Sequence, residues 1–259
     1  PQAEPDKKDA EKKLQELVAS IADLQNVLYA DNRWSLLLIF QAMDAAGKDS
    51  TIKNLLSGVN PQGCEVYSFK RPSEEELGHD FLWRTSKCLP QRGNIGVFNR
   101  SYYEETLVVR VHPSILDGQH LPKACLTEDI WDERFEDIRH FEKHMDRNGT
   151  KVLKFFLHIS LDEQKKRFLE RLDNPAKNWK FESADLEERK FWKEYMVAYE
   201  ETIKNSASDA APWYVIPGND KPYARLAVAD AVLQTLQSLD LKYPKLEKDE
   251  QKNLPPPTL

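Results

Sequence analysis

The sequence predicts an α/β fold in which a five-stranded parallel sheet carries helices on both faces, giving three layers. Two observations lead to this prediction: short continuous apolar runs occur along the chain, and segments of helical periodicity separate them. The 259 residues, 40% of them hydrophobic, are enough for one large core, and no repeat or linker composition divides them. We therefore expect a single domain over residues 1–259.

The elements follow in order from the hydrophobic pattern. Apolar residues three and four positions apart predict an amphipathic helix over residues 6–30. Unbroken apolar runs are typical of strands buried on both faces and predict strands at 34–43, 64–69, 94–99, 151–159 and 213–217. Helices are predicted at 47–59, 73–89, from 101 onward, 127–146, 160–172 and 220–239. Capping boxes mark two of their starts, at Ser73 with Glu76 and at Ser160 with Glu163.

The two ends and the cysteines limit the class of protein. Residues 1–33 form an N-terminal helix region with a polar start, and the charged, proline-rich residues 245–259 predict a disordered tail. The three cysteines, in no paired spacing, indicate neither a disulfide framework nor a zinc site and fit a reducing compartment. No apolar run approaches the roughly 20 residues of a membrane span. We expect a soluble, cytoplasmic protein.

The net charge of -6 argues against a nucleic-acid-binding protein, because such proteins usually present a basic surface. Any polyanionic ligand must therefore meet a local basic channel. Candidates for such a channel are Lys70, Arg84 and a basic stretch around "DNPAKNW" that interrupts a helical pattern. We interpret residues 160–190 as a lid, whose cations Arg167, Arg171, Lys177 and Lys180 would face a phosphate substrate. The alternative is a solvated charged helix, which we favour for Lys165 and Lys166.

The stretch "QAMDAAGKDST" lies between a predicted strand and a predicted helix. Gly47 and Lys48 occupy the last positions of the phosphate-loop pattern G-x-x-x-x-G-K-[ST], but Ala42 replaces its first glycine and Asp49 follows the lysine. A strand, a tight turn and a helix start place backbone amides around one point, which captures phosphate. The alternative is an ordinary turn with a solvent-exposed lysine.

Asp44 lies inside this loop, three residues before Gly47. A carboxylate beside bound phosphates is unfavourable unless a metal ion lies between them or the acid orients an incoming phosphate. A cap for the following helix is the structural alternative. Asp44 is therefore a candidate metal ligand or aligning group.

A second group of polar residues, Asn99, Arg100 and Glu104, follows the third predicted strand. In a doubly wound sheet this strand end faces the same crevice as the loop, so the three side chains are expected to converge on it. Arg100 offers a planar fork for phosphate oxygens, and Glu104 is a candidate metal ligand. An i,i+4 surface pair of Arg100 with Glu104 is the alternative.

Other candidates are weaker. His140 and His144 have metal-binding spacing but no further motif, so we treat them as surface residues. Trp179 lies in the predicted lid and is the one aromatic residue that we consider for base stacking.

Taken together, five segments in this order resemble the polyphosphate kinase 2 family over about residues 34–244. They are "QAMDAAGKDSTIKNLLSGVNPQG", "SFKRPSEEELGHDFLWR", "VFNRSYYEETLVVRV", "LDNPAKNWKF" and "APWYVIP". The likeness is greatest to the class III branch, which accepts nucleoside mono- and diphosphates. Other branches have Asp in place of Asn99 and Asn in place of Glu104, so the carboxylate has moved across the site.

The resemblance implies a P-loop kinase-like fold with a helical lid and phosphoryl transfer from inorganic polyphosphate to AMP, ADP or other nucleotides. It implies Mg²⁺, or Mn²⁺ in its place. Because this chain departs from the other branches at residues 99 and 104, our own hypothesis is that Asp44 and Glu104 jointly hold or orient the ion. The resemblance makes Asp44, Lys48 and Arg100 the expected catalytic residues: Lys48 and the amides of residues 45–48 would cradle phosphates, and Arg100 would neutralise charge. The expected contacts to nucleotide or polyphosphate are Ala45, Ala46, Gly47, Asp49, Ser50, Lys70, Arg84, Asn99, Arg167, Arg171, Lys177 and Lys180.

Two other functions stay open at this point. One is an ATP-dependent nucleotide kinase of the thymidylate-kinase type, although no Ser or Thr directly follows Lys48. The other is a non-catalytic nucleotide-binding regulator. A homo-oligomer, either dimer or tetramer, is expected, with no nucleic acid or membrane partner.

Overall fold

The computed structural model describes residues 7–180 and 183–245. In these residues five parallel strands form one sheet, in the order β2-β3-β1-β4-β5. The strands are β1 Ser35–Gln41, β2 Cys64–Ser68, β3 Ile95–Asn99, β4 Thr150–His158 and β5 Trp213–Pro217. The predicted fold class is confirmed, and each predicted strand is present with ends shifted by two residues or fewer. The polar start and the tail 246–259 lie outside the described residues.

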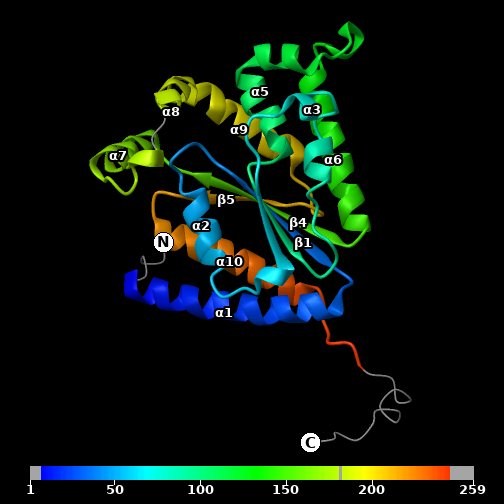
Figure 1. The fold of residues 1–259 in the computed structure, drawn as a ribbon, viewed down its shortest axis with the longest axis vertical. Helices are drawn as coiled ribbons and strands as arrows, with labels where there is room; N and C mark the ends of the chain where they lie inside the picture. The colour runs from blue at the N-terminus through cyan, green and yellow to red at the C-terminus, as the bar shows by residue number, and fades with distance from the viewer. Residues whose placement is uncertain (1–6, 181–182, 246–259) are drawn as a thin grey trace, which may run out of the picture.

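Helices cover both faces of the sheet (Figure 1). One face carries α1 Lys7–Asp31, α2 Lys48–Leu55 and α10 Lys221–Ser238, and the other carries α6 Ile130–Arg147 and α9 Trp192–Ser206. The central strand β1 is buried along its whole length. Its Leu36, Leu38 and Phe40 pack with the first set of helices, whereas Leu37 and Ile39 pack with the second. This alternation explains why the strand is an unbroken apolar run.

The predicted helix over residues 73–89 is in fact two short helices, α3 Glu74–Leu77 and α4 Trp83–Ser86. The capping box of Ser73 with Glu76 is present and opens α3. The helix stops at Gly78, and the Asp80 side chain then accepts the amide of Leu82 at 2.9 Å. Because this side chain competes with helical hydrogen bonding, the chain bends between the two helices.

The helix predicted from residue 101 onward is also broken. Residues Tyr102–Thr106 form the 3₁₀ helix η2, α5 spans Val108–Val111, and a further 3₁₀ helix, η3, spans Pro113–Gln119. Leu107 lies between η2 and α5 with non-helical dihedrals. The Ser101 hydroxyl accepts the amide of Tyr103 and so favours a tight first turn.

The lid region contains α7 Leu161–Asp173, the 3₁₀ helix η5 Asn178–Lys180 and α8 Ser183–Glu188. Only half of the predicted capping box at α7 forms: Ser160 Oγ accepts the amide of Glu163 at 3.2 Å, but the Ser160 amide donates to Asn219. The Glu163 carboxylate bonds to Arg167 instead. Helix α9 was not predicted from the sequence. No helix in the described part of the chain is both long and apolar enough to cross a membrane.

Candidate active site

The phosphate-loop segment, residues 42–47, joins the end of β1 to the start of α2. Two of its residues adopt left-handed backbone conformations, Ala45 with φ of 63° and Gly47 with φ of 102°. The conformation of Gly47 strains any side chain, which is the physical reason for glycine at this position. The positive end of the α2 dipole and the first-turn amides of α2 point toward this turn. The strand, turn and helix predicted around Gly47 are all present.

Helix α7 holds the outer side of this loop through three consecutive carbonyl groups. Gln164 Nε2 donates to the carbonyl oxygen of Asp44 at 3.0 Å. Arg167 Nη1 donates to the carbonyl oxygens of Ala45 and Ala46 at 3.1 and 2.8 Å. In a trans peptide unit the N–H points away from the C=O, so this bracing turns the following amides away from α7.

Arg167 has a bracing role that the sequence did not predict. The residue is 4% exposed. Besides the two loop carbonyls, its guanidinium donates to the carbonyls of Gly218 and Asn219 at 2.7 and 3.2 Å and to Glu163 at 2.7 Å. These five bonds use all five N–H groups of an arginine. Arg167 thus ties the loop to α7 and to the segment before α10, and its contact with polyphosphate stays a prediction.

Two further predicted phosphate contacts stabilise the loop itself. The Ala46 amide donates to the Met43 carbonyl at 3.3 Å. The Ser50 hydroxyl donates to the Gly47 carbonyl at 2.9 Å. The amides of Ala45 and Gly47, which follow braced carbonyls, and the first-turn amides of α2 are the donors that the geometry favours for phosphate.

Lys48 lies against the loop, where its Nζ donates to the carbonyl of Ala42 at 3.0 Å. Burial lowers the pKa of the Lys48 ammonium and the nearby Arg100 lowers it further, while Asp44, Glu104 and Asp49 oppose the shift. The lysine is therefore held within a group of charges and not in open solvent, as a phosphate-binding lysine requires.

Arg100 joins the loop to the turn after β3. Its Nη2 lies 3.1 Å from Asp44 Oδ1, and its Nη1 lies 3.5 Å from Glu104 Oε2. The i,i+4 pair therefore exists, but Asp44 reaches the same guanidinium from 56 residues away. Asp44 is not a helix cap, because α2 has no side-chain cap bond. The predicted convergence of the two strand ends is what the structure shows.

Asn99 and Asp49 also meet, since Asn99 Nδ2 donates to Asp49 Oδ1 at 2.9 Å. Asn99 thus links the end of β3 to the first turn of α2. Both residues lie beside the phosphate loop, as the sequence predicted.

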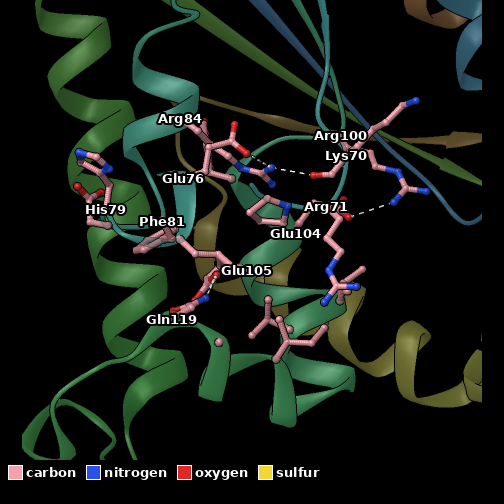
Figure 2. Close-up of a pocket in the computed structure, with 18 of the residues that line it drawn as sticks. Lys70, Arg71, Glu76, His79, Phe81, Arg84, Arg100, Glu104, Glu105 and Gln119 are labelled. Carbon is pink, nitrogen blue, oxygen red and sulfur yellow. Dashed lines mark hydrogen bonds and ion pairs between the residues drawn. The ribbon is translucent and has the colours of Figure 1, made fainter. Parts of the chain in front are cut away.

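A cavity of about 580 Å³ opens next to Arg100. Figure 2 shows the cations Lys70, Arg71 and Arg100 on one side of it and Phe81, Glu105 and Gln119 on the other. The predicted residues Lys70 and Arg84 line it, and Arg84 Nη1 donates to the Lys70 carbonyl at 2.7 Å. The volume falls within the range of small-molecule sites.

The far side of the cavity was missed by sequence reasoning. Glu105 is 6% exposed; its carboxylate accepts Gln119 Nε2 at 2.9 and 3.0 Å and lies 3.1 Å from Arg134 Nε. Burial raises the pKa of Glu105, while Gln119 and Arg134 oppose the shift. Arg134 also lies over the Phe81 ring at 4.4 Å. The second Glu of "YYEE" was the one available signal for this group.

The remaining lid residues stand apart from this cavity. Arg171 Nη1 lies 3.3 Å from Asp185 and so connects α7 to α8, and Trp179, 75% exposed, donates to the carbonyl of Ala176. Lys177 is exposed, and the side chain of Lys180 lies outside the described residues.

Partial burial lowers the pKa of Lys221, and repulsion from Arg167 and Lys177 adds to the shift. Lys221 therefore lies within range of the charges of Arg167 and Lys177, and also of the carboxylates of Glu170 and Glu163, which oppose the shift.

Comparison with known proteins supports one family. The chain matches the sequence model of "Polyphosphate kinase 2 (PPK2)" over residues 4–244. The chain belongs to the polyphosphate kinase 2 family. It is 55% identical to an ADP-polyphosphate phosphotransferase of Rhodopseudomonas palustris, over 92% of this chain and 82% of that one. It is 45% identical to an AMP/ADP-polyphosphate phosphotransferase of Meiothermus ruber, over 88% and 82%.

A solved structure of polyphosphate kinase 2 from Arthrobacter aurescens TC1 has the same fold. Its TM-score is 0.89 at 38% identity, covering 97% of this chain and 87% of that one. The predicted family and enzyme class are thus confirmed, and the chain is a phosphotransferase of the polyphosphate kinase 2 family. The thymidylate-kinase-type and regulator alternatives receive no support.

The brace made by Arg167 leads to a stability prediction. Arg167→Ala leaves the Glu163 carboxylate and several loop carbonyls without their donor, so the free energy of unfolding should fall by about 3 kcal/mol. Arg171→Ala, one turn along α7, removes a partly exposed ion pair and should cost less than about 1 kcal/mol. Urea unfolding of both variants measures this difference. If Arg167→Ala kept wild-type stability but lost affinity for polyphosphate, the predicted substrate role would be supported.

Proposed function

We propose that this chain transfers the terminal phosphoryl group of inorganic polyphosphate to AMP and ADP, giving ADP and ATP. The names of the two relatives, which act on ADP and on AMP or ADP, support this choice of acceptor. The observation that carries the proposal is the position of Arg100. It lines the cavity and also reaches Asp44 of the phosphate loop at 3.1 Å, so a nucleotide-sized cavity and a phosphate site meet at one guanidinium.

In this proposal the acceptor nucleotide occupies the cavity, with its phosphate beside Arg100. Phe81 provides an apolar wall for the base, and Glu105 and Gln119 provide polar atoms at the far side. The polyphosphate chain approaches the phosphate loop from the side of Lys177 and Lys221. The basic residues are local, which reconciles a polyanionic substrate with a net charge of -6.

The reaction needs little covalent chemistry from the protein. A terminal phosphate oxygen of the acceptor forms a bond to the terminal phosphorus of polyphosphate, and the bridging P–O bond to the rest of the chain breaks. The attacking oxygen is already anionic near neutral pH, so no strong general base is required. Lys48, the loop amides and Arg100 position the phosphates and offset the charge that spreads over the transferred group. Asp44 aligns Arg100 and thereby the acceptor phosphate.

A divalent cation, Mg²⁺ or Mn²⁺, fits the carboxylates that the site offers. No cluster of three or more His, Cys, Asp or Glu side chains suited to a metal occurs among the described residues. Mg²⁺ is commonly held by one or two carboxylates together with substrate phosphates, and Asp44 and Glu104 on either side of Arg100 provide that number. When bound, such an ion neutralises phosphate charge.

The first test is a phosphorylation assay with AMP or ADP, Mg²⁺, and either long-chain polyphosphate or ATP as the only donor. Wild-type protein should form ADP and ATP with polyphosphate, and Asp44→Asn should be at least about 100-fold slower because Arg100 loses one of its two charged partners. Asp162→Asn, on the exposed start of α7, is the control and should stay active. Turnover with ATP but not with polyphosphate would contradict the proposal that polyphosphate is the phosphoryl donor.

Different mutations should affect the KM of the acceptor nucleotide and the KM of polyphosphate. Phe81→Ala should raise the KM for AMP and ADP about tenfold and leave the KM for polyphosphate unchanged, because only the acceptor meets this wall. Lys221→Ala should do the reverse, raising the KM for polyphosphate alone. Steady-state kinetics with each substrate varied in turn measures both effects. A change of the same KM in both variants would contradict the placement of the two substrates.

Glu104 provides a test of the metal hypothesis. Glu104→Gln should raise the Mg²⁺ concentration that gives half-maximal rate by about tenfold, since an amide binds Mg²⁺ less well than a carboxylate. The exposed Glu74→Gln serves as the control. An unchanged Mg²⁺ dependence in Glu104→Gln would rule out Glu104 as a ligand of Mg²⁺ and leave Asp44 as the remaining one of the two proposed ligands.

A further inference from the structure

A buried acid–base pair lies beneath the turn that carries Arg100. Lys154 on β4 and Glu142 on α6 are 0% and 1% exposed, and Lys154 Nζ lies 2.6 Å from Glu142 Oε2. Neither residue lines the cavity. The pair belongs to no part of the reaction described above, so its presence in the core needs another reason.

Two tyrosine hydroxyls and one backbone carbonyl form further hydrogen bonds with the pair. Two consecutive tyrosines, Tyr102 and Tyr103, donate their hydroxyl protons to Glu142 Oε1 at 2.8 and 2.7 Å. Lys154 Nζ also contacts the Tyr103 hydroxyl at 2.9 Å and the Ser206 carbonyl at 2.8 Å. The network thus joins β4, α6 and α9 to η2.

Stability alone is a poor explanation for this network. Burial raises the pKa of Glu142 and lowers the pKa of Lys154, so both groups are forced away from their charged forms, against their mutual attraction. Replacing a buried ion pair by apolar residues of similar volume is often neutral or stabilising. Buried networks of this kind do, however, fix one arrangement of the groups bound to them.

The network binds Tyr102 and Tyr103, which belong to the turn after β3 that begins with Arg100. Tyr102 and Tyr103 lie in the sequence between Arg100 and Glu104, which form an ion pair, and Arg100, Tyr102 and Glu104 all line the cavity. Arg100 has φ of 65°, a left-handed conformation that a non-glycine residue adopts only at a cost. Such a conformation persists when the surrounding structure holds the chain on both sides.

On one side Arg100 is held by the sheet, because its amide donates to the carbonyl of Phe40 at 3.0 Å. On the other side the chain enters η2, where both tyrosine side chains are fully buried and reach Glu142. The Glu142 carboxylate is therefore the second fixed point of the turn.

We propose that Glu142 and Lys154 are positioning residues, which anchor Tyr102 and Tyr103 so that Arg100 keeps its left-handed turn and its guanidinium stays between Asp44 and Glu104. The inference rests on the proposed role of Arg100 in phosphoryl transfer. It predicts that the pair controls the rate of transfer more than the binding of either substrate, because a small displacement of a positioned group is costly in the transition state.

The test replaces both charges at once, as Glu142→Leu with Lys154→Met. The apolar pair leaves both tyrosine hydroxyls and the Ser206 carbonyl without partners, so the melting temperature should fall by several degrees. The kcat of the folded protein should fall roughly 10- to 100-fold with each KM changed less than about threefold. The matched control is the neighbouring pair of Asp146 and Lys151, on the same helix and strand and also 2.6 Å apart. Asp146→Asn with Lys151→Met should leave kcat unchanged. Wild-type kcat in the apolar pair would overturn the proposal.

A second variant guards against loss of folding. Tyr102→Phe with Tyr103→Phe keeps the ion pair and the core volume but removes both hydroxyl donors. It should lower kcat in the same way, and wild-type kcat in this variant would equally overturn the proposal.

A double-mutant comparison shows whether the effect passes through Arg100. In an Arg100→Lys background, the tyrosine replacement should change the residual rate less than about threefold, because the group that it positions is already gone. A full additional loss in that background would contradict positioning through Arg100. If wild-type protein itself shows no transfer from polyphosphate, the proposed function fails, a result that none of these variants produces.

Discussion

The parallel pairing of β1 with β3 is the constraint on which the rest of the site depends. Its register sets Phe40 opposite Asn99, so the phosphate loop and the turn after β3 leave the sheet at the same point. The amide of Arg100 then donates to the carbonyl of Phe40, which fixes the start of the turn. Without this register, Asp44 and Arg100, 56 residues apart in the sequence, would not meet. The crevice at the carboxyl ends of parallel strands is the usual ligand site of such sheets.

Around this point, one set of side chains fixes the backbone of the loop and of η2, and another set faces the substrates. Arg167 and Gln164 turn the loop carbonyls toward α7, and the buried pair of Glu142 with Lys154 holds the tyrosines of η2. The side chains of the first set are buried, with their polar atoms used by protein partners. Lys48, Asp44 and Arg100 are enclosed by them but remain partly accessible. Catalysis by positioning needs this division, because a group that contacts phosphate has to be rigid before phosphate arrives.

The site also shows how an acidic protein handles anionic substrates. The cations occur in two places, on one side of the cavity and near the start of α10, and carboxylates lie close to both. Arg100 illustrates the balance, since Asp44 and Glu104 compensate its charge when no phosphate is near. A compensated guanidinium stays in one place, whereas a solvated one would sample many rotamers and lose entropy on binding.

The sequence by itself determined the parallel sheet, its five strands, the phosphate loop and the convergence of Asp44 with Arg100. The sheet, its strands and the loop follow from local patterns: buried strands need apolar runs, and a strand–turn–helix unit has one geometry. The convergence of Asp44 with Arg100 was predicted from the shared edge of parallel strands, and the register of β1 with β3 achieves it. Only the tertiary structure decided what Arg167 does, where the cavity lies and why a lysine occurs in the core of β4. The sequence does not show whether a charged residue on a helix faces substrate or packed backbone. The packing of the helix against the rest of the protein decides which side chains point inward. The cavity walls come from separate segments that share no spacing. The breaks in the helices after Ser73 and Ser101 accompany local side-chain bonds to the amides of Leu82 and Tyr103, which helical periodicity does not reveal.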